Sequence, residues 1–548
     1  MSAAAEPPTE SLSSVGGDGG GPSGGHLARN TAIFSIATAV SRVAGLVREI
    51  IAASFFGTSG PMSAFTLANQ VPNLISNLFA QAALSAAFVP VFTELLEKGR
   101  RREAFQLAST LFWLLLLVLG ALTAIFIVAA GLVMPLFTGP TFNPELDTLL
   151  VGLSQVLFPS VMLLGLTGLL VGILQSYDHF TIPALAPAVW NLVIVALLVA
   201  LHPQFHGGYH DGDALYAYAI AWLAATFVQM VMVAGALGRI DFRLQPHIDW
   251  RDPRVRQVLT LMLPVAIGLG IVNLDQLLNS VFGTLVSEEA PSAIEKAFRI
   301  YMLPQGMFSV AVATVLFPTL SRLAARSDAA RMRSALGTGM RQINLLLIPA
   351  TAFMVVLPTP ITRLLYERGQ FNARSTELAS IALFWFAFSL PFGGINLLLT
   401  RTFFSLQRPW IPTGLAAINI VVDIVVSVAL YKPLGIAGLI IGTLVANVVM
   451  TALQYRRLRI GFNSSLEGAQ TTMITARILV ASVLLGAVSW VVWYGLDALL
   501  GRSLPAQIVS VGGAGVAGTL VYSRAVLAMR VPEAHEVSRL IRTQLGRA

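Results

Sequence analysis

The sequence contains no cysteine. Disulfide bonds, thiolate nucleophiles and cysteine-ligated zinc or iron–sulfur sites are therefore excluded. Charge is also scarce, because 11% of the 548 residues are Asp, Glu, Lys or Arg, whereas a soluble domain carries about 25%. So little charge cannot cover a water-exposed surface of this length, and a chain of several soluble domains is not expected.

The sequence instead contains many long apolar stretches. Hydrophobic residues make up 55% of the chain, and the mean hydropathy is +0.75. Since a membrane-spanning helix needs about 20 mostly apolar residues, the pattern predicts an all-α integral membrane protein with about fourteen transmembrane helices. The expected spans are 31–56, 63–93, 106–137, 147–175, 183–202, 214–237, 257–284, 294–320, 335–358, 375–403, 411–430, 435–455, 472–498 and 505–529.

Basic residues gather in alternate loops between these spans. The clusters lie at 98–102, 239–256, 322–333, 456–459 and after 529. Because basic loops stay on the cytoplasmic side, this distribution predicts that both termini are cytoplasmic. The outer loop at 363–374, with three arginines, is an exception. Helix orientation accounts for the net charge of +8, so no nucleic-acid partner is expected.

Three pairs of segments repeat at an offset of about 229 residues. They are TFNPELDTLL (141–150) with QFNARSTELA (370–379), FVPVFTELL (88–96) with LFPTLSRLA (316–324), and Ser176 and Pro183 with Ser405 and Pro412. Six expected spans separate equivalent points, so the halves are parallel and related by an axis along the membrane normal. The repeat predicts two pseudo-symmetric six-helix lobes plus two C-terminal helices, with a substrate site between the lobes.

The repeat and the composition together set the expected domain boundaries. They are a disordered cytoplasmic tail at 1–28, an N-lobe at 29–240, a C-lobe at 241–458, the two added helices at 459–530 and a cytoplasmic tail at 531–548. The first tail is rich in Gly, Ser, Pro and Ala, a composition that cannot bury enough apolar surface to fold.

Three arginines fall inside apolar spans. Arg42 and Arg48 belong to SRVAGLVRE (41–49), where Glu49 adjoins them, and Arg299 precedes Pro304. A charge in the hydrocarbon core costs about 3 kcal/mol or more, so such residues usually face a cavity. An arginine fork matches phosphate oxygens, which indicates a cationic cavity for an anionic, phosphorylated substrate. The alternative is snorkelling to the interface or a buried Arg–Glu pair.

A second polar set is acidic and lies in the predicted C-lobe. Asn419 and Asp423 are four residues apart on one helix face, Asp275 lies in the expected span 257–284, and Thr443 lies in 435–455. Carboxylate, amide and hydroxyl oxygens suit a sodium ion or a proton, so a coupling-ion site is one interpretation. Hydrogen bonding between helices is the other. No further cofactor is expected.

Four segments carry a family resemblance. SRVAGLVRE (41–49), VPNLISNLFA (71–80), AFRIYMLPQGMFSVAVATVLFPTLSR (297–322) and LLYERGQFNA (364–373) resemble the MurJ (MviN) family of lipid II flippases. That family belongs to the superfamily of MATE drug exporters and polysaccharide flippases, and the resemblance covers about residues 29–530. It implies a protein of the bacterial cytoplasmic membrane that is not an enzyme. The implied role is to move lipid II, the undecaprenyl-diphosphate-linked peptidoglycan precursor, to the outer leaflet, in contact with cell-wall synthesis proteins.

The resemblance also implies which residues bind the substrate and which bind a sodium ion. Arg42, Arg48 and Arg299 match family arginines of the central cavity, and Glu49 and Asn77 lie beside them. The residues that look similar to a family sodium site are Asp275, Asn419, Asp423 and Thr443. One departure is that many members carry an arginine pair where this chain has Ser76 and Asn77.

The favoured hypothesis is a flippase that works by alternating access. The lipid tail would follow a groove formed by 459–530, and a cation or the membrane potential would reset the cycle. Two transport alternatives are a flippase for another polyprenyl-diphosphate-linked glycan and a cation-coupled multidrug exporter. A scaffold for cell-wall assembly and an enzyme of lipid-linked sugars are the alternatives from other classes.

Overall fold

The computed structural model describes residues 24–79, 81–177, 179–205, 212–240, 242–462, 467–535 and 539. Every regular element in these ranges is a helix, which confirms the all-α prediction. The tails predicted at 1–28 and 531–548 lie mostly outside the described residues.

The first lobe is built from eight α-helices and one short 3-10 helix. They are α1 (Gly24–Phe56), α2 (Gly60–Phe79), α3 (Gln81–Glu97), α4 (Arg101–Val133), η1 (Met134–Phe137), α5 (Pro144–Leu157), α6 (Pro159–Ser176), α7 (Thr181–Phe205) and α8 (Ala214–Leu237). The expected span 147–175 is thus two helices. Pro159 begins the second of them, because proline has no N–H to continue the hydrogen-bond ladder.

The second lobe and the added helices follow. They are α9 (Pro253–Gly283), α10 (Ala290–Pro304), η2 (Gln305–Ser309), α11 (Val310–Ala325), α12 (Ala329–Val356), α13 (Pro358–Tyr366), α14 (Ala373–Ser405), α15 (Trp410–Leu434), α16 (Ile436–Gly461), α17 (Gly468–Leu500) and α18 (Leu504–Ala528). The π-turn η2 directly follows Pro304, as expected where a proline interrupts the regular helical bonds.

Eleven helical segments of the described chain are long and apolar enough to cross a membrane. The other expected spans coincide with α1, with α2 and α3, and with α9, which are helical but fall outside that set. Of these, α1, α2 and α9 contribute polar side chains to the cavity described below. The total of fourteen transmembrane helices therefore stays a prediction.

The two lobes share the predicted repeat. Helices α7 and α15 begin and end 229 residues apart. Asn143 caps α5 by accepting a hydrogen bond from Leu146 N at 2.9 Å, and Asn372 caps α14 in the same way from Ser375 N at 3.0 Å. The pseudo-symmetry is therefore present in the capping residues as well as in the order of helices.

Equivalent residues of the two lobes also meet each other. Ser292 N donates to Ser63 Oγ at 3.2 Å, and these positions are 229 residues apart. Residues related by a symmetry axis can touch only close to that axis. The contact therefore marks where the pseudo-symmetry axis passes between α2 and α10.

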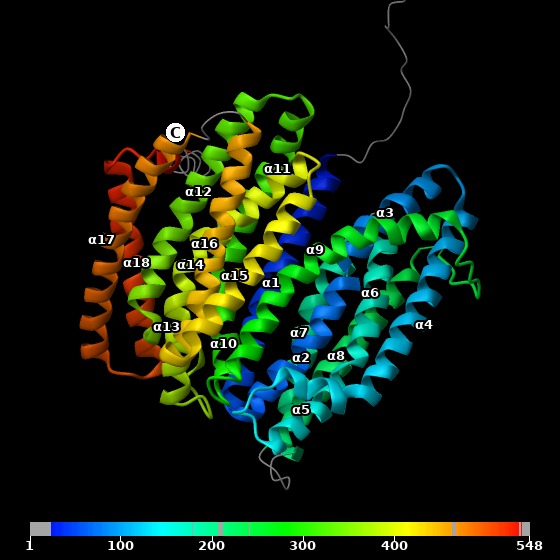
Figure 1. The fold of residues 1–548 in the computed structure, drawn as a ribbon, viewed down its shortest axis with the longest axis horizontal. Helices are drawn as coiled ribbons and strands as arrows, with labels where there is room; N and C mark the ends of the chain where they lie inside the picture. The colour runs from blue at the N-terminus through cyan, green and yellow to red at the C-terminus, as the bar shows by residue number, and fades with distance from the viewer. Residues whose placement is uncertain are drawn as a thin grey trace, which may run out of the picture.

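Each lobe has its own apolar core, and two helices run between the lobes (Figure 1). Helix α9 packs against α2 and α3 on one side and against α10 and α15 on the other. Helix α1 packs against α7 and also touches α13. The hairpin α17–α18 lies at the far edge of the second lobe, against α12 (Figure 1).

The lobes are joined at the end of the bundle away from the start of α1. Gln370 N donates to Ser54 O at 2.8 Å, and the Thr58 hydroxyl donates to Ser375 Oγ at 2.7 Å. Gly369 has φ +56°, and a Cβ there would lie 2.2 Å from Ser54 O. This contact, which we call the end closure (residues 54–58 with 369–375), therefore requires glycine at position 369.

Candidate functional site: a charged cavity between the lobes

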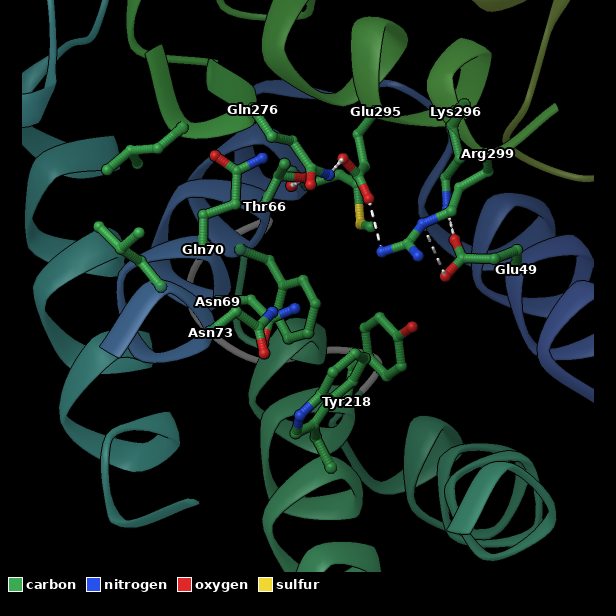
Figure 2. A pocket seen from close by; sticks show the side chains of 15 residues that line it. Glu49, Thr66, Asn69, Gln70, Asn73, Tyr218, Gln276, Glu295, Lys296 and Arg299 are labelled. Atoms are coloured by element: carbon green, nitrogen blue, oxygen red, sulfur yellow. Dashed lines mark hydrogen bonds and ion pairs between the residues drawn. The ribbon is translucent and has the colours of Figure 1, made fainter. Parts of the chain in front are cut away.

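A cavity of about 220 Å³ lies where α1, α2 and α8 face α9 and α10 (Figure 2). Its lining is Glu49, Met62, Phe65, Thr66, Asn69, Gln70, Asn73, Leu74, Tyr218, Trp222, Gln276, Leu277, Glu295, Lys296 and Arg299. The two lobes both contribute, so the cavity lies where the repeat predicts a substrate site.

Glu49 is the centre of the charges in this cavity. Lys296 Nζ lies 2.7 Å from its Oε2, and Arg48 Nη2 lies 2.6 Å from its Oε1. Arg299 Nε is 3.9 Å from the same Oε1 (Figure 2). Lys296 is fully buried. One carboxylate of α1 is therefore shared by a neighbour on its own helix and by two cations of α10.

Arg48 is held behind Glu49 rather than in the cavity itself. Its Nη1 donates to Asn191 Oδ1 at 3.0 Å. Its guanidinium lies over the rings of Trp190 and Trp222, at 5.0 and 4.8 Å from the ring centroids. Cation–π contacts of this kind stabilise a desolvated guanidinium. Arg48 therefore fixes the position of Glu49.

Arg299 is the cation that reaches into the cavity. Its Nη2 lies 2.7 Å from Glu295 Oε1, and Gln276 Nε2 donates to Glu295 Oε2 at 2.8 Å. The side chain of Arg299 keeps 39% of its surface exposed, although its Nε is buried on the side of Glu49. A guanidinium that lines a cavity and stays partly exposed can bind an incoming anion.

The wall opposite these charges is uncharged and formed by α2. Asn69, Gln70 and Asn73 are spaced so that they lie on one helix face, toward the cavity (Figure 2). Gln70 Nε2 donates to Ser280 Oγ at 2.7 Å, whereas its Oε1 has no partner among the described residues. Amide side chains both donate and accept, so this wall can bind hydroxyl and peptide groups.

Two predicted binding residues lie apart from the cavity lining. Arg42 is exposed on α1, and its guanidinium lies beside Gly306 of η2, where an added Cβ would be 2.7 Å from Nη1. The side chain of Asn77 lies outside the described residues. Its neighbour Ser76 is buried, and its hydroxyl has no partner in the described part of the chain. The roles predicted for Arg42 and Asn77 stay predictions.

Lys296 and Glu295 are cavity residues that the sequence reasoning missed. Both lie within two turns of Glu289, the residue before α10, and at the start of the expected span 294–320. A lysine that close to a helix end is usually assigned to snorkelling. The sequence did contain a signal for Lys296. Burying a charge in the membrane is costly, so the argument that singled out Arg299 applies equally to Lys296.

The predicted acidic residues come together in part. Asp423 of α15 is buried, and its Oδ1 accepts hydrogen bonds from Ser427 Oγ at 3.1 Å and from Thr443 Oγ1 at 3.5 Å. Asn279 Nδ2 donates to Thr443 Oγ1 at 3.0 Å. Asn419 is half-buried one turn before Asp423 and makes no hydrogen bond to any described residue.

The carboxyl groups of Asp275 and Asp423 lie close enough to interact. Asp275 Oδ1 and Asp423 Oδ2 have no donor among the described residues. Two carboxylates in contact repel unless a proton or a cation lies between them. With the hydroxyl of Thr443 nearby, this oxygen set fits a hard cation such as sodium.

The fold and the cavity define a class of protein. Two helical lobes related by an internal repeat, with a polar cavity between them, are the architecture of a class of membrane transporters. The chain has a TM-score of 0.62 to an inward-facing multidrug resistance MATE transporter, at 16% identity, covering 79% of this chain and 94% of that one. At that identity the likeness shows the fold.

The chain belongs to the MurJ family of lipid II flippases. The family model described as "Lipid II flippase MurJ" matches residues 52–504. A "Probable lipid II flippase MurJ" of Rhizobium meliloti (strain 1021) is 30% identical over 477 residues, 85% of this chain and 87% of that protein. One of Rhizobium tropici is 31% identical over 478 residues, with the same two coverages.

A solved structure of a family member has the same fold. The structure titled "Lipid II flippase MurJ, inward closed conformation" has a TM-score of 0.73 to this chain, at 21% identity, and covers 90% of this chain and 100% of its own. Sequence and fold therefore point to one family, and the resemblance seen in the four segments is confirmed.

Proposed function

We propose that this protein flips lipid II from the inner to the outer leaflet of the cytoplasmic membrane, for peptidoglycan synthesis. The observation that carries the proposal is the group of cations, Arg48, Lys296 and Arg299, at the cavity between the lobes of a MurJ-family chain. Cations suit the diphosphate of lipid II, and the amide wall of α2 suits its sugars and peptide.

The charge of the cavity also separates this function from drug export. An exporter of organic cations needs acidic groups that are free to bind its substrate. Here the two cavity carboxylates, Glu49 and Glu295, are both engaged by basic side chains. The cation available to a ligand is Arg299, which favours an anionic substrate.

The end closure would lie toward the outer leaflet. The basic loops 98–102 and 322–333 join helices at the opposite end of the bundle, and basic loops stay cytoplasmic. Both termini would then be cytoplasmic. Transport by alternating access requires that the contacts between 54–58 and 369–375 break when the cavity opens outward.

Asp275, Asp423 and Thr443 would hold a coupling sodium ion. The support is that two carboxyl groups lie close together and that the buried oxygens Asp275 Oδ1 and Asp423 Oδ2 accept from no described residue. A bound cation would supply the positive charge that two adjacent carboxylates need.

The test is rescue of a flippase-depleted bacterium, with accessibility of lipid II on the outer leaflet as the readout. We expect Arg299→Ala to abolish rescue while the protein still inserts into the membrane. Arg100→Ala is the matched control, because Arg100 is exposed and pairs with Glu103 away from the cavity. Full rescue by Arg299→Ala would contradict the role given to the cationic cavity. If another polyprenyl-linked glycan became accessible on the outer leaflet in place of lipid II, that glycan would be assigned as the substrate.

A further inference from the structure

The ion pairs around Glu49 cross the boundary between the lobes. Glu49 and Arg48 belong to α1, whereas Lys296 and Arg299 belong to α10. With Glu295, the cluster contains three cations and two carboxylates. Each cation therefore already has a carboxylate partner before any substrate enters.

The cations differ in how much they depend on Glu49. Arg48 has Asn191 and two indole rings as further partners. Lys296 has Glu49 as its ion-pair partner in the described chain, apart from the ring of Tyr366, whose centroid is 5.9 Å from Nζ. An ammonium group has three donors, so Lys296 needs an anion nearby to remain charged when buried.

We propose that Glu49 is an exchangeable counter-anion, which holds Lys296 and Arg299 while the cavity is empty and yields both cations to the diphosphate of the substrate. The proposal rests on the proposed function and adds Lys296 as a binding residue and Glu49 as a positioning residue. Arg48 keeps Glu49 neutralised after the exchange, because its own contacts do not involve α10.

The exchange links the occupancy of the cavity to the contact between α1 and α10. In an empty cavity, separating these helices would leave Lys296 buried without an anion, and breaking a buried ion pair is strongly unfavourable. A bound diphosphate supplies the anion in place of Glu49. The substrate therefore lowers the cost of separating the lobes, and the empty protein remains closed around Glu49.

The experiment measures binding of inorganic pyrophosphate to the purified full-length protein by calorimetry, at fixed ionic strength. We expect Glu49→Gln to bind pyrophosphate about tenfold more tightly than the wild type, because the competing anion is gone. We expect Lys296→Gln to bind about tenfold more weakly, and the double variant to lie near the wild type. A purely structural role for Glu49 would weaken binding when the residue is changed, so a gain in affinity is the diagnostic result.

A second variant covers the case in which Glu49→Gln does not fold. Glu49→Asp keeps the charge beside Arg48 but shortens the reach toward Lys296, so its affinity should also rise, by a smaller factor. Glu103→Gln is the matched control. Glu103 also pairs with two arginines, Arg100 and Arg254, but lies outside the cavity lining, so its variant should bind like the wild type.

The outcomes separate the exchange from the flippase function. Two results would overturn the exchange and leave the flippase assignment standing. One is unchanged or weaker binding by both Glu49 variants. The other is that no variant binds pyrophosphate while depletion rescue succeeds. The expected order of affinities together with failed rescue by the wild type would support the exchange and overturn the flippase assignment.

Discussion

Two buried polar clusters of this protein differ in what they join. The cluster around Glu49 links α1 of the first lobe to α10 of the second. The cluster around Asp423 links α9, α15 and α16, which all belong to the second lobe. A movement that separates α1 from α10 must break the first cluster, whereas the second stays intact as long as α9 moves together with α15 and α16. An anion at the first therefore acts on lobe separation, and a cation at the second acts on the stability of one lobe.

The largest expected effect comes from breaking the cluster that joins the lobes. Arg48→Ala removes the partner that fixes Glu49, together with its contacts to Asn191 and two tryptophans. Breaking a buried ion pair of this kind should lower the free energy of unfolding by about 3 kcal/mol or more. Thermal unfolding in detergent measures the effect, and the exposed Arg331→Ala is the control. Equal midpoints for the two variants would mean that Arg48 does not hold the cluster.

The second cluster should respond to sodium. If Asp275 and Asp423 bind the ion, sodium at one hundred times its dissociation constant should stabilise the wild type by about 2.7 kcal/mol relative to potassium. Asp423→Asn should lose this difference. The measurement is the midpoint of thermal unfolding in matched sodium and potassium buffers. A sodium-dependent shift that survives in the variant would place the ion elsewhere.

The end closure is a contact between the lobes that is formed by uncharged groups. Gly369→Ala places a Cβ 2.2 Å from Ser54 O at φ +56°, so we expect destabilisation of about 2 kcal/mol and weaker closure. Gly131→Ala in α4 is the control, since nothing lies within 4 Å of its added Cβ. The chain lacks cysteine, so one introduced at Ser375 reports closure through its reactivity with a thiol reagent. Unchanged reactivity in the Gly369 variant would argue against the closure.

The smallest effects compare the lobes directly. Asn143→Ala and Asn372→Ala remove equivalent N-caps, and each should cost about 1 kcal/mol of stability. Thermal unfolding of the two variants and of their combination gives the comparison. A difference of several kcal/mol between them would show that the lobes use these caps differently.

More of the fold than of the site could be predicted from the sequence. Apolar length sets the positions of the helices, and the offset of 229 residues, visible at Asn143 and Asn372, gives the two lobes. Both are local or periodic properties of the sequence. The breaks within the expected spans depend on prolines such as Pro159, which membrane helices often tolerate, so their effect could not be read in advance.

Most charged residues of the site could be predicted from the sequence, whereas the contacts between them could not. Arg48, Glu49 and Arg299 stand out because a charge in an apolar span is costly. Which of them faces the cavity depends on partners remote in sequence, such as Asn191, 143 residues from Arg48. Helix rotation decides such contacts. Lys296 was missed for another reason, because a lysine near a helix end is usually assigned to snorkelling.

The contact between Ser63 and Ser292 has a consequence for the origin of the fold. In a two-fold symmetric dimer, the residues nearest the axis meet their own copies. Here the two serines meet across the pseudo-symmetry axis within a single chain. The interface between the lobes thus retains the geometry of a homodimer, as expected if one ancestral half was duplicated and fused. Once joined in one chain, two such halves can change independently, and here Glu49 lies on one side of the cavity and Lys296 on the other.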